Sequence, residues 1–288
     1  MPELPEVETV RMQLQQKIAG KTIDSVEVFH AKSANHDEQI DDILRGKTFS
    51  TIDRIGKLMI FCFADEPDLF LLSHLRMTGQ FFYIDQDGDI VGGGHSLSKS
   101  DSLDFPHKHS RVAFHLTDHT SLYFNDMRIF GYIKRANAKE VAAARARFGP
   151  ELIAKDFDYR QFWAGLKKRK TPIKAALLDQ SFVAGLGNIY VDEALWRAKI
   201  RPTRRADKVT KKEAEALAAA SGDVMRESIA VGGTTFQHFQ DTDGAKGNFT
   251  QYLKVFGQQG TACERCGETI KKMQCAGRGT HYCPGCQK

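Results

Sequence analysis

Two pairs of cysteines near the end of the chain constrain its fold more than any other feature. They stand in CERC (Cys263 and Cys266) and CPGC (Cys283 and Cys286), with sixteen residues between the pairs. Each C-x2-C pair can form a knuckle that offers two sulfurs to one ion, so the spacing predicts a four-thiolate, tetrahedral zinc site. The last 30 residues have too little apolar content for a core of their own. A metal ion would therefore hold this segment together as a finger.

Other uses of these cysteines stay open at this point. A disulfide pair is the main alternative, although a cytosolic chain makes it less favourable. Redox chemistry is a weaker alternative because two motifs occur together. A closed four-cysteine site leaves no position for a substrate, so its zinc would be structural. Cys62 is expected to be buried in a strand, Cys275 falls outside the spacing, and His281 is a possible substitute ligand.

Composition indicates an ordinary globular chain. The 288 residues are 41% hydrophobic, with a mean hydropathy of -0.40, and they are long enough for two domains. No apolar stretch is long enough for a membrane span and the acidic start does not resemble a signal peptide, so we expect a cytosolic protein without membrane contact. The net charge of +5 and the pI near 8.8 permit an anionic partner without requiring one.

The first half of the chain has the pattern of one helix followed by short strands. Apolar residues at helical spacing predict a helix from Glu6 to Ala19, and Gly20 ends it. Seven short β-rich runs follow, at 25–29, 58–63, 69–75, 80–84, 112–116, 121–124 and 129–134. So many short strands suggest an antiparallel sandwich or barrel. Residues Gly92 to Ser110 lack periodicity and are predicted to form a long surface loop.

The second half is predicted to be helical. Helices are expected at 141–148, 159–170, 172–180, 188–200 and 211–230, with Pro172 at a helix start. A basic cluster from Lys167 to Lys174 lies at one helix end; a solvated helix face would explain four of its five basic residues equally well. Gly185 and Gly187 are predicted to form a tight turn, and Asn188 to cap the next helix.

These features together favour a nucleic-acid partner. Backbone N–H groups at a helix start form an anion site. A basic cluster, a helix–turn–helix and a zinc finger each supply contacts to backbone phosphates. Any one of the three alone would be a weak signal.

The start of the chain, MPELPEVETV, raises a chemical possibility. A small residue at position two normally permits removal of Met1, which would leave Pro2 with a free secondary amine. Such an amine titrates at about 7.7 to 8.0 and is partly nucleophilic at neutral pH, and Glu3 would stand beside it as an acid or base. The alternative is that Pro2 is only a start residue and Glu3 complements the helix dipole. Ten residues do not decide between these two.

Seven motifs in order carry a resemblance. They are MPELPEVET, RIGK, HLRMTG, DMRIFG, LLDQSFVAGLGNIYVDEAL, the VGGTTFQHFQDTDGAKGNF region and the terminal C-x2-C-x16-C-x2-C. From end to end, the chain resembles the formamidopyrimidine-DNA glycosylases of the Fpg/Nei family. The resemblance implies an α+β fold: an N-terminal helix and antiparallel β-sandwich (2–135), a helix–two-turn–helix domain (141–232), and a lesion-loop region with a four-cysteine zinc finger (233–288, finger 255–288). DNA would lie between the halves.

The resemblance also implies a bifunctional glycosylase and AP lyase acting on double-stranded DNA with an oxidised base or an abasic site. Pro2 would attack C1′ of the damaged nucleotide and Glu3 would assist. Lys57 and Arg278 have proton-donor roles in the family. A guanidinium group is a poor acid, however, and Arg278 is better suited to clamping phosphate.

Further residues match the family's DNA contacts. Lys57, His74, Asn188 and Arg278 match its phosphate grip; His109 and Arg169 align with further contacts, and Lys174 is counted with the basic cluster. Met77, Arg128 and Phe130 match the residues that fill the gap left by the flipped nucleotide, and Arg128 would face the orphaned cytosine. Without the resemblance, Met77 and Phe130 would be interpreted as core residues of strands.

Two departures from the family pattern accompany this interpretation. Arg76 stands where many members have glycine, and Gln258 where arginine is usual. A sister group of endonuclease VIII type prefers oxidised pyrimidines and commonly begins PEGPE, whereas PELPE here favours purine lesions. A non-catalytic, damage-binding zinc protein and a small-molecule enzyme that uses an N-terminal proline also stay open. We expect a monomer in the bacterial cytosol.

Overall fold

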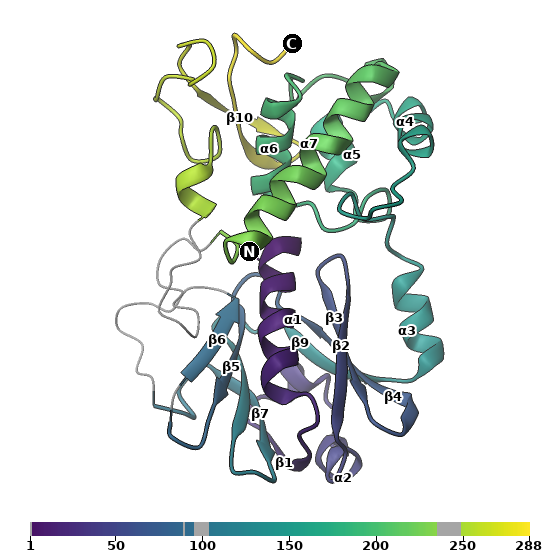
Figure 1. The fold of residues 1–288 in the computed structure, drawn as a ribbon, viewed down its shortest axis with the longest axis vertical. Coiled ribbons are helices and arrows are strands. Elements are labelled where there is room, and N and C mark those ends of the chain that lie inside the picture. The colour runs from purple at the N-terminus through teal and green to yellow at the C-terminus, as the bar shows by residue number, and fades with distance from the viewer. Residues whose placement is uncertain (1, 89, 95–103, 235–248) are drawn as a thin grey trace. The chain divides into compact units, whose positions relative to one another are not determined.

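A computed structural model describes residues 2–88, 90–94, 104–234 and 249–288 of the chain (Figure 1). These residues divide into two compact units. The N-terminal unit holds the described residues up to Ala146 together with Gly232 to Thr234, and the C-terminal unit holds 147–231 and 249–288. No helix in these ranges is both long and apolar enough to cross a membrane.

The N-terminal unit begins with helix α1 (Leu4–Ile18). Its start lies two residues before the predicted one, because a proline is tolerated in the first helical turn, where its missing N–H has no helical partner. Glu3 and Glu6 form a capping box, in which the backbone N–H of Glu3 donates to Oε2 of Glu6 at 2.8 Å. This bond fixes the direction in which the chain enters the helix.

Two antiparallel sheets form the body of this unit, which confirms the predicted α+β class with a β-sandwich. The five-stranded sheet has the order β1 (Ile23–Val28), β7 (Ser110–Leu116), β8 (Ser121–Asp126), β5 (Gly79–Ile84), β6 (Ile90–Gly94). The four-stranded sheet has the order β2 (Phe49–Ile55), β3 (Leu58–Phe63), β4 (Glu66–His74), β9 (Tyr132–Ala136). Side chains from both sheets and from α1 meet in one core.

Aromatic rings fill the centre of that core. Phe49 stacks on Phe63 with ring centroids 5.2 Å apart, and Phe81 lies 5.2 Å from Phe124 on the other sheet's strands. Val7, Val10, Leu14 and Ile18 of α1 belong to the same cluster. Burial of large aromatic and aliphatic side chains at about 25 cal/mol per Å² is the main stabilising term here.

Helix α1 lies against edge strands of both sheets, β2 and β6 (Figure 1). Its polar side chains bond the free backbone groups of β2. Gln15 donates from Nε2 to the carbonyl of Ser50 at 3.0 Å and accepts from the N–H of Ile52 at 2.6 Å. Arg11 donates to the carbonyl of Ile52 at 3.1 Å. The helix therefore supplies hydrogen-bond partners to the backbone of Ser50 and Ile52 on this edge strand.

Shorter elements cover the other two edges. The 3-10 turn η1 (Ala31–Ala34) contacts β9, and helix α2 (Ile40–Leu44) contacts β1. Asp41 of α2 accepts the N–H of Val26 at 2.6 Å. Helix α3 (Ala138–Arg145) follows β9 and begins with a capping box of Asn137 and Glu140.

Several predictions for this unit were wrong in detail. Strands β2 and β6 were not expected, because β2 is rich in polar residues and β6 in glycine. Gly92, predicted to be loop, lies in β6, where a Cβ would come within 2.2 Å of the Phe82 ring. Residues 95–103 of the predicted loop lie outside the described ranges. The run at 129–134 is a turn up to Gly131, and strand β9 begins only at Tyr132.

The C-terminal unit is built on helices, as predicted. They are α4 (Tyr159–Lys167), α5 (Ile173–Leu178), α6 (Asn188–Arg197) and α7 (Lys211–Ala230), with 3-10 turns η2 (Ala206–Lys208) and η3 (Phe249–Tyr252). A hairpin of β10 (Lys271–Cys275) and β11 (Arg278–Tyr282) ends the unit. Helix α6 packs against α5, α7 and β11. One buried helix thus supports both the helical part and the finger.

Candidate metal centre and nucleic-acid interface

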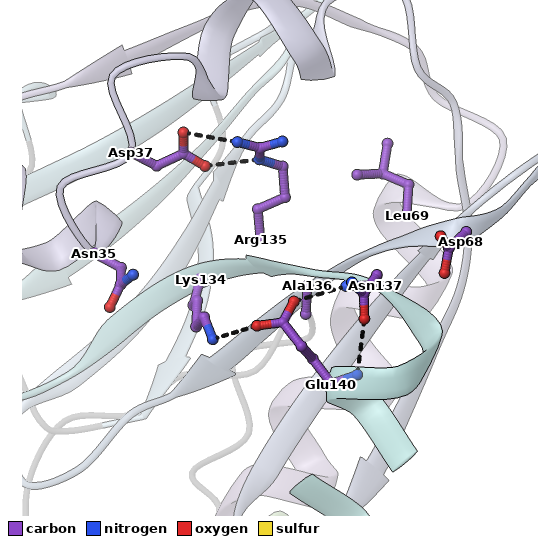
Figure 2. A pocket seen from close by; sticks show the side chains of 9 residues that line it. All are labelled: Asn35, Asp37, Asp68, Leu69, Lys134, Arg135, Ala136, Asn137 and Glu140. Carbon is purple, nitrogen blue, oxygen red and sulfur yellow. Dashed lines mark hydrogen bonds and ion pairs between the residues drawn. The ribbon is translucent and has the colours of Figure 1, made fainter. Parts of the chain in front are cut away.

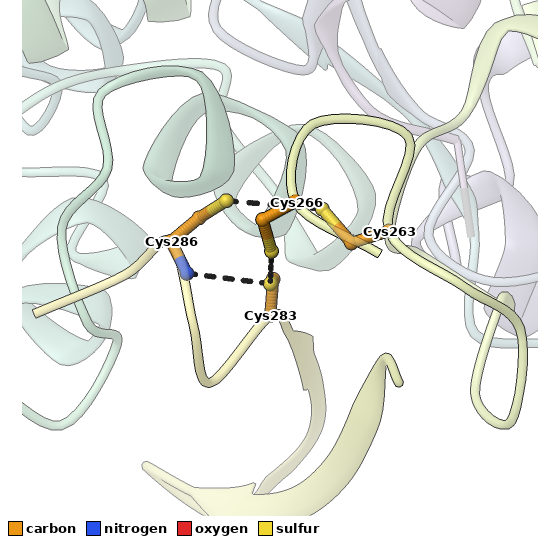
Figure 3. A group of neighbouring side chains, drawn as sticks. All are labelled: Cys263, Cys266, Cys283 and Cys286. Atoms are coloured by element: carbon orange, nitrogen blue, oxygen red, sulfur yellow. Dashed lines mark hydrogen bonds between the residues drawn. The ribbon is translucent and has the colours of Figure 1, made fainter. Parts of the chain in front are cut away.

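The four predicted cysteines meet at one point of the C-terminal unit (Figure 3). Their sulfur atoms all lie within 4.8 Å of one another, with 3.8 Å between Cys263 and Cys286 and 3.4 Å between Cys266 and Cys283. Four sulfurs bound tetrahedrally at about 2.3 Å from zinc would lie about 3.8 Å apart. The residues fit one structural zinc ion, as predicted from their spacing.

A tryptophan supports this cluster from helix α6. The indole N–H of Trp196 donates to Sγ of Cys263 at 3.4 Å, and the guanidinium of Arg265 lies 4.0 Å from the Trp196 ring. Burial disfavours the Cys263 thiolate, but hydrogen bonds from Trp196 and from the backbone N–H groups of Arg265 and Cys266 lower the pKa of this thiol to about 6. A thiolate is the form that binds zinc.

The remaining cysteines and His281 lie outside the cluster. Cys275 is buried and donates to the carbonyl of Pro202 at 3.7 Å. Cys62 lies in β3, as expected, but is only half-buried. The ring of His281 packs against Phe256 with centroids 4.9 Å apart. Within the described residues, the metal-binding group contains cysteines alone.

Arg278 follows the two-residue turn of the finger hairpin. The hairpin pairs Cys275 with Arg278, and both residues between them have positive φ, 52° at Ala276 and 68° at Gly277. That combination is the two-residue turn whose twist matches antiparallel strands. The turn leaves the Arg278 side chain exposed at the first position of β11. An exposed guanidinium in a rigid turn is suited to bidentate phosphate contact.

Lys174 is placed differently from the prediction. Its side chain is fully buried, and Nζ lies 2.6 Å from Oδ1 of Asp192, which is also fully buried. The expected direct DNA contact is therefore contradicted by the burial of the ammonium group. Oδ2 of Asp192 accepts the backbone N–H of His281 at 2.8 Å. This ion pair joins α5, α6 and the finger hairpin from inside the unit.

Asn188 is also placed differently from the prediction. Gly187 is the N-cap of α6, and Asn188 is the first helical residue. Its amide donates instead to the carbonyl of Gly279 at 3.0 Å, next to Arg278, while Gly185 makes the expected turn with φ of 95°. Two predicted phosphate contacts, Asn188 and Arg278, are thus neighbours in this unit.

Arg169 is held by local partners. Its guanidinium lies 4.0 Å from the Phe182 ring centroid and donates to the carbonyl of Gly165 at 3.1 Å. It also forms an ion pair with Asp179 at 3.4 Å. These contacts fix the side chain at the end of α4.

In the N-terminal unit, Pro2 and Glu3 are both buried at the start of α1. Glu6 links this start to a distant segment: its Oε1 accepts the N–H and the hydroxyl of Thr234, both at 2.8 Å. The pattern Glu3-x-x-Glu6 is a readable capping-box signal, but its second partner 228 residues away has no sequence signal. The lesion-loop residues 235–248 lie outside the described ranges.

Lys57 is positioned by an ion-pair chain from α1. It is buried and follows Gly56 in the turn between β2 and β3. Arg54 donates to the carbonyl of Gly56 at 2.8 Å and to Oε2 of Glu8 at 2.7 Å. Burial disfavours the charge on Glu8, yet bonds from Arg11 and Arg54 lower its pKa. The charged pair ties the Lys57 turn to the helix that carries Pro2.

His74 lies at the end of β4 as a neutral donor. Burial, followed by the positive charges of Arg76 and Lys57, lowers the pKa of His74 to about 3. Its Nδ1 accepts the N–H of Arg76 at 3.0 Å. The neutral ring therefore carries its proton on Nε2, which can donate to a phosphate oxygen. His109 lies beside His107, whose Nδ1 accepts the His109 N–H at 3.0 Å.

Met77, Arg128 and Phe130 come together on the surface of the N-terminal unit. Met77 is 39% exposed and Phe130 48% exposed, so neither is a core residue. The Arg128 guanidinium lies 4.6 Å from the Phe130 ring centroid, and its Nη1 lies 3.1 Å from Sδ of Met77. Met77 comes from the turn between β4 and β5, and Arg128 and Phe130 come from the turn between β8 and β9. Together the three side chains form one exposed cluster that is both apolar and cationic.

A separate cavity of about 420 Å³ lies beside β9 (Figure 2). Four of its charged groups are paired with one another: Arg135 bonds both carboxylate oxygens of Asp37, and Lys134 bonds Glu140. Within the described part of the chain, its lining includes no site residue predicted from sequence. The cavity is therefore not the candidate site.

Comparison with known proteins agrees with this arrangement. Three family models match: "Formamidopyrimidine-DNA glycosylase N-terminal domain" at residues 1–133, "Formamidopyrimidine-DNA glycosylase H2TH domain" at 148–240, and "Zinc finger found in FPG and IleRS" at 260–288. A formamidopyrimidine-DNA glycosylase of Lactiplantibacillus plantarum is 41% identical over 288 residues, covering 99% of this chain and 98% of the relative. One of Lactobacillus delbrueckii subsp. bulgaricus is 38% identical over the full length of both chains.

Solved structures agree as well. The Lactococcus lactis Fpg in complex with abasic-site DNA matches with a TM-score of 0.86 and 35% identity, and MutM with carbocyclic 8-oxo-G DNA matches with a TM-score of 0.84 and 35% identity, each covering 100% of both chains. The fold and the metal centre define the class, a DNA glycosylase of DNA repair with a C-terminal zinc finger. The chain belongs to the formamidopyrimidine-DNA glycosylase family, which confirms the resemblance found in the sequence.

Proposed function

We propose that this chain is a bifunctional DNA glycosylase and AP lyase that removes oxidised purines from double-stranded DNA. Its substrates would be 8-oxoguanine opposite cytosine and formamidopyrimidines, in the bacterial cytosol. The observation that carries the proposal is the exposed cluster of Met77, Arg128 and Phe130. Chemistry on a base in a duplex requires the nucleotide to leave the stack, and apolar side chains are suited to fill the gap. Arg128 would then face the orphaned cytosine.

The reaction would begin at Pro2 after removal of Met1. The secondary amine attacks C1′, the bond from C1′ to the base nitrogen breaks, and the base leaves with the electron pair and takes up a proton. Glu3, whose buried carboxylate belongs to the capping box of α1, would assist proton transfer at the sugar. The amine nitrogen loses its proton, the C1′–O4′ bond then breaks as O4′ takes up a proton, and the opened sugar carries an iminium at C1′.

The iminium is an electron sink that makes the C2′ proton labile. Loss of this proton breaks the C3′–O bond and releases the 3′ phosphate, and a second elimination releases the 5′ phosphate. Lys57, held by the turn that Arg54 and Glu8 support, is suited to proton transfer in these steps. Hydrolysis then returns the free amine.

Phosphate contacts would come from both units. In the N-terminal unit, His74 offers Nε2–H and His109 lies near the end of β8, where its carbonyl accepts the N–H of Asp126 at 3.0 Å. In the C-terminal unit, Asn188 and Arg278 form a neighbouring pair, and Arg169 lies at the end of α4. We assign Arg278 to phosphate clamping, because guanidinium is a poor acid.

The test is borohydride trapping on duplexes that contain 8-oxoguanine or an abasic site. Mass spectrometry first establishes that the purified protein begins at Pro2. Borohydride reduces the iminium and should give a stable protein–DNA adduct, which the Pro2→Gly variant should not form at a comparable rate although it still binds the duplex. Absence of an adduct from protein with a free Pro2 would contradict the enzyme mechanism. Faster excision of an oxidised pyrimidine than of 8-oxoguanine would contradict the substrate assignment.

A further inference from the structure

The carboxylate of Asp126 is a hub between the two turns that carry the gap-filling cluster. It ends strand β8 and is fully buried. Oδ2 accepts the backbone N–H groups of Phe130 at 2.8 Å and Gly131 at 2.6 Å. Oδ1 accepts the N–H of Arg128 at 3.1 Å and the hydroxyl of Thr78. All four donors come from the segments around Met77, Arg128 and Phe130.

Thr78 makes the link to the other turn. It directly follows Met77, and its hydroxyl oxygen also accepts the N–H of Arg128 at 3.0 Å. The β4–β5 turn and the β8–β9 turn are therefore joined through one hydroxyl and one carboxylate. Hydrogen bonds to a carboxylate are about twice as strong as bonds between neutral groups.

The backbone between the bonded groups has an unfavourable conformation. Ile129 has φ of +55°, which a β-branched residue rarely adopts. The residues on either side of it, Arg128 and Phe130, both donate their N–H groups to Asp126. Gly131 completes the turn: a Cβ there would lie 3.1 Å from Oδ2 of Asp126 and 2.9 Å from the Phe124 ring. The β8–β9 turn keeps this conformation because the Asp126 carboxylate bonds the residues before and after Ile129.

We propose that Asp126 is a positioning residue that sets the enzyme's preference for the base opposite the lesion. It holds the Arg128 backbone in the conformation in which the guanidinium lies beside Met77 and Phe130. This inference rests on the proposed gap-filling role of Arg128. Loss of the carboxylate should affect discrimination between opposite bases more than it affects DNA binding.

The test compares four variants by the ratio of kcat/KM for 8-oxoguanine opposite cytosine to that opposite adenine. Asp126→Asn keeps the shape but puts an N–H₂ group against backbone N–H donors, so its ratio should fall by about tenfold, as for Arg128→Ala. Thr78→Val removes only the shared hydroxyl and should lower the ratio less. Asp118→Asn is the matched control, since Asp118 accepts the N–H and hydroxyl of Thr120 in the β7–β8 turn. Its ratio should stay at the wild-type value.

The outcomes separate the two proposals. If Arg128→Ala keeps the wild-type ratio, the gap-filling assignment itself fails. If Arg128→Ala lowers the ratio but Asp126→Asn and Thr78→Val do not, only the positioning role of Asp126 is overturned. Equal loss of activity on both duplexes by Asp126→Asn would also overturn it, since a merely structural role predicts that result. If circular dichroism shows that Asp126→Asn does not fold, the kcat/KM ratio of Thr78→Val decides: a lowered ratio supports the positioning role, and a wild-type ratio overturns it.

Discussion

The indole nitrogen of Trp196 lies 3.4 Å from the sulfur of Cys263, within hydrogen-bonding distance. Trp196 is 8% exposed and belongs to the same apolar cluster as Val255 and Ile270, which surrounds the metal centre. Helix α6 therefore takes part in the surroundings of a metal site whose ligands all come from the finger. Partners of this kind orient a ligand and moderate the negative charge on its sulfur.

Replacing Trp196 should weaken zinc retention. Trp196→Phe keeps an aromatic ring and loses the N–H donor, so zinc should dissociate about tenfold faster to a chromogenic chelator. Trp163→Phe is the control, because the indole of Trp163 donates to the carbonyl of Val209 at 3.2 Å, away from the cysteines. Equal dissociation rates for the wild type and Trp196→Phe would show that the N–H···S bond has no effect on the metal.

Replacing Lys174 should destabilise the C-terminal unit from inside. Lys174→Met leaves the buried carboxylate of Asp192 without its cation, and loss of one partner of a buried pair costs about 3 to 5 kcal/mol. Urea unfolding monitored by circular dichroism measures the loss. The double variant Lys174→Met/Asp192→Asn should recover part of it. A single variant as stable as the wild type would mean that the pair contributes nothing to stability.

His74 should make the N-terminal unit sensitive to mild acid. Its pKa is about 3 in the folded chain and near 6.5 when unfolded, so the unfolded state binds more protons between these values and stability falls as pH decreases. From pH 6.5 to 5 the loss from this group is about 2 kcal/mol. His74→Gln should lose less stability over this interval than the wild type, as measured by urea unfolding at each pH. His119→Asn, at an exposed position, is the control and should lose as much stability as the wild type. If the stability of His74→Gln falls with pH in parallel with that of the wild type, the lowered pKa of His74 is refuted.

Glu8 should affect the chemistry of Lys57 through Arg54. Glu8→Gln replaces the charged partner of Arg54 by a neutral amide, so the turn that carries Lys57 is held less firmly. We expect single-turnover strand cleavage to slow by about tenfold and duplex affinity to change less than twofold. Glu27→Gln, at an exposed position of β1, is the control. Equal reductions in cleavage and in affinity would argue that Glu8 only stabilises the fold.

Local patterns in the sequence predicted much of this structure. The cysteine spacing located the metal site because two knuckles place four sulfurs around one ion whatever the rest of the chain does. Helix α7 has the predicted bounds, since Thr210 and Glu213 form a capping box with local partners. Strand β3 likewise has the predicted bounds, because its apolar run is buried.

Tertiary partners decided what the sequence could not predict. Lys174 looked like part of a solvated basic run, and only the packing of α5 against α6 brings it to Asp192. Strand β2 was missed because it is rich in polar residues, whose partners lie far away in the sequence: Arg54 pairs with Glu8 of α1 and Asp53 with Arg145 of α3. Met77 and Phe130 have the composition of core residues, and their exposure follows from two turns that no periodicity marks. Asp126 accepts backbone N–H groups from its own turn, but its bond to Thr78, 48 residues earlier, has no local signal in the sequence.

The four sheet edges of the sandwich are each in contact with another element of the chain. Side chains of α1 bond the backbone of β2, Asp41 bonds that of β1, and β6 and β9 lie against α1 and η1. An open edge is a template on which a second chain can add a strand, and strand addition leads to aggregation. Helix α1, which directly follows Pro2 and Glu3, thus also protects two of these edges from pairing with a second chain. Changes that loosen α1, such as Gln15→Ala, would endanger the colloidal stability of the protein as well as its chemistry.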